Sequence, residues 1–173
     1  IIGVIKQNGQ SILETVDKTI RNADNLICVC PSSTCPSSIL RPGGGYIKSS
    51  LVVVKEGVYA RFDFIEPTAS TNGYVEWASF KLPDTNPSGT DENLYVAEFD
   101  KVACINPMDD LITNSNVVND VSQLTDTNSQ TGVSVIGLTF SEEAPQAGFK
   151  EIVNVSFSVG PGVAAPASVA GQI

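Results

Sequence analysis

The chain has 173 residues, 42% of them hydrophobic and 17% charged, a balance that predicts one globular domain rather than a disordered chain. Its formal net charge is −9 and its ten lysine and arginine residues are scattered, so we expect no binding to nucleic acid. The chain has no histidine, which excludes Ser-His-Asp triads, Cys-His nucleophiles and His-ligated zinc. Carboxylate, lysine and tyrosine chemistry remain possible, but we expect a protein that is not an enzyme.

The first predicted element is an amphipathic helix over residues 1–28. Apolar side chains recur there at steps of three, four and seven, which places them on one stripe of a helix. Pro31 cannot continue a helix, so we expect the helix to end near Leu26–Cys28. Gly9 lies inside it and is expected to weaken it by about 1 kcal/mol relative to alanine. The expected packing face consists of Ile5, Ile12, Val16, Ile20, Ala23 and Ile27.

Three of the four cysteines, Cys28, Cys30 and Cys35, lie where this helix ends and a connecting loop, predicted over residues 29–45, begins. Their spacing matches neither the Cys pairs of zinc sites nor the Cys-x-x-Cys redox motif. Two disulfides of an exported protein are the favoured interpretation. We prefer the pairs Cys30–Cys35 and Cys28–Cys104, and the pairs Cys28–Cys35 and Cys30–Cys104 remain the alternative.

A β-rich head is predicted over residues 46–160. Apolar and polar side chains alternate along residues 46–54, 57–65 and 73–81, which predicts three strands of an antiparallel meander half buried by the helix. The aromatic side chains of these strands are interpreted as core rather than as a carbohydrate-binding platform. Asp63 and Glu76, on neighbouring strands, are expected to pair with Arg61 or Lys81.

The rest of the head is less regular. Residues 94–105 are interpreted as one strand or two short ones, residues 133–140 and 149–159 as a closing hairpin, and residues 161–173 as a flexible tail.

The polar stretch 106–132 contains weak candidate ligands for Ca²⁺, namely Asp109, Asp110 and Asp120. Their spacing does not match an EF-hand loop, so a solvated loop is favoured and no cofactor is expected. The predicted fold class is α+β, with a long N-terminal amphipathic helix packed on an antiparallel β-sheet.

The stretch IIGVIKQNGQSILETVDKTIRNADNLICV, followed by a β-rich head and a closing hairpin, resembles the type IV pilins and the pseudopilins of type II secretion. The prepilin-peptidase motif of that family is missing, and we expect the apolar part of the stalk to lie upstream of Ile1. The resemblance implies a pilin-like fold and a structural subunit outside the cytoplasm that is membrane-anchored before it assembles with other pilin or pseudopilin subunits. The alternative is a secreted adhesive or carbohydrate-binding β domain.

Overall fold

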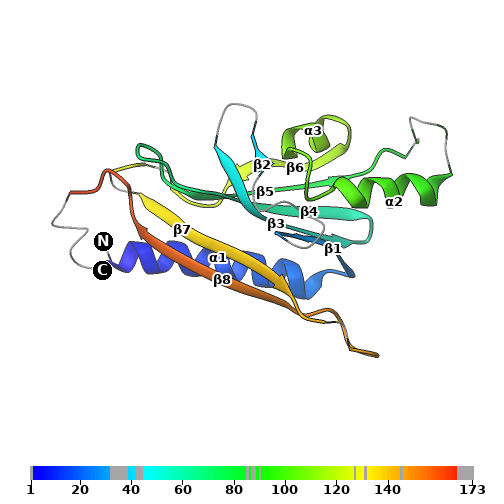
Figure 1. Cartoon of the computed structure of the whole chain (residues 1–173), viewed down its shortest axis with the longest axis horizontal. Coiled ribbons are helices and arrows are strands. Elements are labelled where there is room, and N and C mark those ends of the chain that lie inside the picture. Colours follow the sequence, from blue (N-terminus) through cyan, green and yellow to red (C-terminus); the bar gives the residue numbers. More distant parts are fainter. Residues whose placement is uncertain are drawn as a thin grey trace.

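The computed structural model describes residues 2–31, 39–41, 45–84, 86, 89, 91–126, 128–130, 132–144 and 146–166. Its elements follow one another from a helix at the start of the chain to a hairpin near its end (Figure 1). In chain order they are α1 (Ile2–Asn22), β1 (Asn25–Cys30), β2 (Ile39–Leu40), β3 (Tyr46–Lys55), β4 (Val58–Ile65), β5 (Tyr74–Lys81), α2 (Glu92–Val102), α3 (Met108–Thr113), β6 (Asn116–Gln123), β7 (Val133–Glu142) and β8 (Val153–Pro161).

The strands form two antiparallel sheets. The larger sheet has the order β1-β3-β4-β5-β6, with the short β2 also paired to β3. The smaller sheet is the hairpin β7–β8. One face of the larger sheet is covered by α1 together with this hairpin, and the opposite face is covered by α2, α3 and the turn between them. The larger sheet is therefore the middle layer of three.

The predicted fold class, a long helix packed on one antiparallel sheet, is wrong. The described residues are mostly β, with eight strands in two sheets, and a second sheet shares with α1 the task of covering the first. Sequence reasoning missed this because alternating strands fit one sheet or two equally well. The helix is also shorter than predicted and ends at Asn22.

Residues beyond Asn22 join the sheet instead of extending the helix. The backbone amide of Asp24 donates to the carbonyl of Val54, and β1 then pairs antiparallel with β3. The short apolar run of β1 lies on the sheet rather than on a helical stripe, so Ile27 belongs to a strand. A continuous apolar run of this length is compatible with a buried strand or a helix, and the pairing with β3 decides between them.

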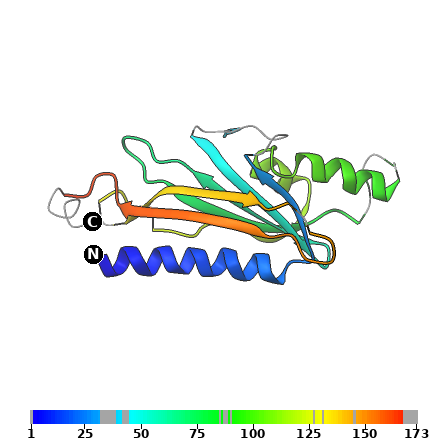
Figure 2. The same cartoon turned by 60° about the horizontal axis from the view of Figure 1, so that its bottom comes forward.

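The first half of the predicted packing face is buried as expected. Ile5, Ile12 and Val16 are at most 6% exposed, and Ile20 packs against the same core while remaining half-buried. Ala23 is buried just beyond the end of the helix. The polar side chains between these residues lie on the outer face of α1, which runs along the hairpin β7–β8 (Figure 2).

Residues 94–105, predicted as strand, form most of α2 and the turn that follows it. The side chain of Asp91 accepts hydrogen bonds from the backbone amides of Asn93 and Leu94, which caps the helix N-terminus. Tyr95, Phe99 and Val102 then recur at helical spacing. The cap residue and this spacing are the local signals that indicate a helix rather than a strand here.

Candidate functional site

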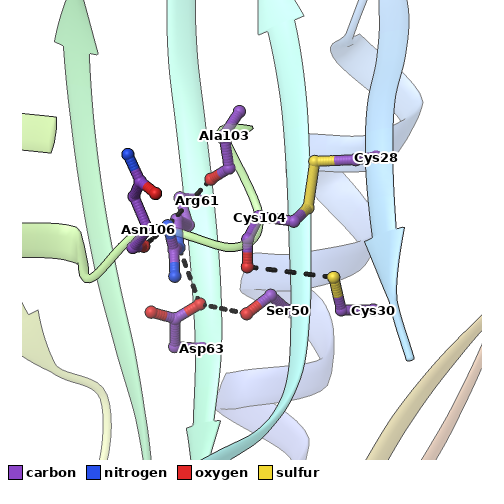
Figure 3. Close-up of a disulfide and its surroundings, with 8 residues drawn as sticks. All are labelled: Cys28, Cys30, Ser50, Arg61, Asp63, Ala103, Cys104 and Asn106. Carbon is purple, nitrogen blue, oxygen red and sulfur yellow. Dashed lines mark hydrogen bonds and ion pairs between the residues drawn. A yellow bond between two sulfur atoms is a disulfide. The ribbon is translucent and has the colours of Figure 1, made fainter. Parts of the chain in front are cut away.

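Chemically distinctive side chains gather between β1, the central strands and the α2–α3 turn. A disulfide joins Cys28 on β1 to Cys104 in the turn, with Cα atoms 6.1 Å apart (Figure 3). This is the pairing favoured from the sequence, and it excludes the alternative in which Cys104 bonds Cys30. The Sγ atom of Cys30 lies 3.8 Å from the carbonyl oxygen of Cys104. Cys35 lies outside the described residues, so the pair Cys30–Cys35 stays a prediction.

Beside the disulfide, Arg61 forms a fully buried clamp on the α2–α3 turn. Its Nη1 donates to the carbonyl oxygens of Ala103 and Asn106 at 2.8 and 2.6 Å, directly after the C-terminus of α2 (Figure 3). Its Nε donates to Asp63 at 2.8 Å, and the hydroxyl of Ser50 donates to the same carboxylate oxygen at 2.6 Å. A cation at a helix C-terminus is favourable because it meets the negative end of the helix dipole.

A second ion pair lies next to this clamp on the same face of the sheet. Arg41 donates to Glu76 at 2.6 Å and to the Tyr74 hydroxyl at 2.7 Å. Glu76 is the cross-strand neighbour of Asp63. Burial raises the pKa of Glu76, and the carboxylates of Asp63 and Asp109 raise it further, while Arg41 opposes these effects. The predicted partners are therefore half correct, since Asp63 pairs with Arg61 but Glu76 pairs with Arg41 and not with Lys81.

The accessibility of these groups determines their chemistry. Arg61 and Asp63 are both 0% exposed and Glu76 is 4% exposed, so no substrate can reach their reacting atoms from solvent. The inner network instead holds a turn to a sheet through hydrogen bonds that are costly to break once buried. The disulfide and the Arg61 clamp thus serve the same structural end, namely fixing α2 and α3 to the sheet.

The calcium candidates occupy two different elements. Asp109 and Asp110 lie in the first turn of α3, where carboxylates stabilise the helix dipole, and Asp120 lies on β6. No group of three or more His, Cys, Asp or Glu side chains placed to hold a metal ion occurs among the residues that the structure describes.

The aromatic side chains of the three central strands lie mainly in the core. Tyr59, Phe62, Phe64 and Phe80 are each no more than 5% exposed, and Tyr59 and Phe80 stack on one another. Of this group Tyr46 is the most exposed, at 45%. Most of the rings of these strands are therefore core, as the sequence predicted.

Sequence reasoning missed the Arg61 clamp and the helix α2. An arginine in the middle of an apolar, alternating strand was the available signal for the clamp, because a lone charge there needs a buried partner or solvent.

Comparison with models of protein families, with curated proteins and with solved structures found no match to this chain. None of the helices in the described part of the chain is long and apolar enough to span a membrane.

Proposed function

We propose that this chain is a non-enzymatic structural subunit, a minor pilin or pseudopilin, of a type IV pilus or type II secretion-like filament. The position of α1 carries the proposal. The helix has 21 residues, or about 31 Å, and its N-terminal end lies at one end of the elongated molecule (Figure 2). A helix placed in this way can continue past the body as an apolar segment that anchors the subunit in a membrane before assembly.

The outer face of α1 is suited to contacts with other subunits. Its polar side chains, among them Lys6, Gln10 and Glu14, are exposed along the length of the helix while the inner face is buried. Neighbouring subunits packed side by side would meet along this face. The proposal therefore assigns assembly to α1 and surface contacts to the β-rich body.

The Cys28–Cys104 disulfide supports a location outside the cytoplasm. Disulfides form and persist in oxidising compartments and are rare where thiols are kept reduced. The proposal rests on α1 and this disulfide rather than on the fold, because the pilin-like fold predicted from the sequence is wrong.

The test uses the full-length protein in its source cells. Antibodies against this domain should label extracellular filaments in immunogold micrographs, and the protein should be enriched with filaments sheared from the cells, while a soluble periplasmic marker stays behind. Recovery of the protein only as a free monomer in the medium would contradict the proposal. Binding of that monomer to a glycan array would instead support the secreted carbohydrate-binding alternative.

A further inference from the structure

Helix α2 presents a ridge to the surface. None of the residues of this 11-residue helix is buried, and Leu94 is 53% exposed. Asp91 and Glu98, three residues before and four residues after Leu94, share its side of the helix and are exposed too. An apolar side chain flanked by two carboxylates thus forms what we call the α2 ridge, defined by Asp91, Leu94 and Glu98.

The ridge lies in the most acidic part of the chain. Residues 82–123 contain eight acidic residues and one basic residue, Lys101, and so carry seven of the nine net negative charges of the whole chain. Lys101 is already paired with Glu98 at 2.5 Å. Some of these acids stabilise helix N-termini, as Asp91 does, but their summed charge still gives this face a negative potential. A partner for this face must therefore be basic around an apolar centre.

The opposite face of the larger sheet offers such a surface on the same molecule. A groove of about 460 Å³ lies between the last turns of α1 and the β3–β4 hairpin. Its apolar lining includes Val53, Val58 and Ala60, and its lysines are Lys18 and Lys55. Both lysine side chains are exposed. One acid, Glu56, also lines the groove, so its charge is positive overall.

The two surfaces lie back to back. Tyr59 on β4 lines the recess under α2, whereas its neighbours Val58 and Ala60 line the lysine groove, because successive side chains of a strand point to opposite faces. A contact between such surfaces joins unlike patches. Repeated from copy to copy by translation, a contact of this kind does not close on itself and extends into a chain of molecules.

We infer that the partner of the α2 ridge is a second copy of this chain, with Leu94 seated in the lysine groove of its neighbour and Asp91 and Glu98 facing Lys18 and Lys55. The inference rests on the proposed function, assembly into a filament, and names the surfaces through which neighbouring bodies meet. Because the charges are exposed, association is expected to weaken as the salt concentration rises.

The test is sedimentation velocity of this 173-residue chain at low salt, from low micromolar to millimolar concentration. The wild type should form species larger than dimers as concentration rises. Leu94→Asp replaces the apolar centre of the α2 ridge by a charge, and Lys18→Glu/Lys55→Glu reverses the charge of the groove. Each change should weaken self-association at least about tenfold. Leu40→Asp, at a leucine that is 63% exposed on β2, is the matched control and should associate like the wild type.

Mixing the two deficient proteins gives the sharpest result. The Lys18→Glu/Lys55→Glu protein keeps an intact ridge, and the Leu94→Asp protein keeps an intact groove. One copy of each can therefore bind the other, and the mixture should form a one-to-one dimer and nothing larger. A wild type that stays monomeric or stops at a closed dimer would overturn the inference, as would variants that associate unchanged or mixtures that remain monomeric. Such results would leave the labelling of filaments by the full-length protein unaffected, so the two proposals can fail separately.

Discussion

At the scale of single residues, the fully buried Arg61 links the α2–α3 turn to the larger sheet. It donates to two turn carbonyls and to one carboxylate oxygen of Asp63 at the same time. Buried ion pairs are rarely better than apolar packing of the same volume, but removing one partner leaves a charge in a medium that cannot solvate it. Arg61 therefore stabilises the fold mainly because the buried carboxylate of Asp63 would otherwise have no cation beside it.

Replacing Arg61 alone tests this dependence. We expect Arg61→Met to lower the free energy of unfolding by about 3 to 5 kcal/mol, because Asp63 is left buried without its cation. The double variant Arg61→Met/Asp63→Leu should lose less than the single variant, since no unpaired charge remains. Urea denaturation followed by circular dichroism measures both values. A double variant that is less stable than Arg61→Met would show that the pair itself, rather than the orphaned carboxylate, governs stability.

At the scale of elements, the contact between α1 and β8 is set by a glycine. Gly9 lies on the buried stripe of the helix, and a Cβ atom placed there would lie 3.3 Å from side-chain carbons of both Phe157 and Val159. From the sequence this glycine appears only as a weakness in the helix. In the structure it allows the helix to approach the hairpin, while Gly3 on the same helix has nothing within 4 Å of such a Cβ.

A leucine at each glycine separates helix propensity from packing. Gly9→Leu should destabilise the protein by about 1 to 3 kcal/mol, because the added side chain cannot fit between α1 and β8 without displacing them. Gly3→Leu should be neutral or stabilising by up to about 1 kcal/mol, because leucine is the better helix former and the site is open. Thermal unfolding of the two variants gives the comparison. Equal effects at both positions would mean that α1 does not pack on β8 as described.

The elements also show which parts of the fold the sequence specifies. Strands predicted at residues 46–54, 57–65 and 73–81 correspond closely to β3, β4 and β5, because alternation and turn residues are local signals. The covering of both sheet faces could not be predicted in this way. The polar side chains Arg61 and Asp63 alternate as solvent-facing residues would, and only the distant α2–α3 turn, which packs on them, makes them interior.

In the candidate site too, some contacts could be predicted from local sequence patterns and others could not. The Cys28–Cys104 pair could be favoured from spacing. If Cys30 pairs with the nearby Cys35 across a short loop, Cys104 is the partner that remains for Cys28. The ion pair of Glu76 with Arg41 could not, because Arg41 follows the short strand β2 and reaches the sheet through tertiary contacts alone. Local patterns thus predicted most strands and one disulfide, but not the layers or the buried network.

At the scale of the whole molecule, the Cys28–Cys104 disulfide connects β1, an edge strand of the larger sheet, to the α2–α3 turn that covers one face of this sheet. It closes a loop over a sequence separation of 76 residues. In the chain-entropy description a loop of this length stabilises the folded state by up to about 4.5 kcal/mol. The bond therefore contributes on the scale of the total stability of a typical domain.

Removing this disulfide should loosen the α2–α3 layer before the sheet. We expect Cys28→Ser/Cys104→Ser to lower the free energy of unfolding by about 2 to 4.5 kcal/mol. Amide hydrogen exchange should rise most in α2, which has no buried residues of its own, and least in β4. Chemical denaturation and exchange mass spectrometry measure the two effects. An unchanged exchange rate in α2 would mean that the Arg61 clamp alone holds this layer.

The same covalent loop has a consequence for a protein that is pulled. A tensile force applied to the two ends of the chain passes from Cys28 directly to Cys104 and bypasses everything between them. The strands β2 to β5 and the helix α2 lie inside that bypass, so the force cannot pull their backbone out along its length while the disulfide is intact. Roughly 260 Å of chain is thereby withheld from extension, at about 3.4 Å for each of the 76 steps. Stretching can extend α1, α3, β6 and the β7–β8 hairpin, whereas the chain between the two cysteines keeps its length.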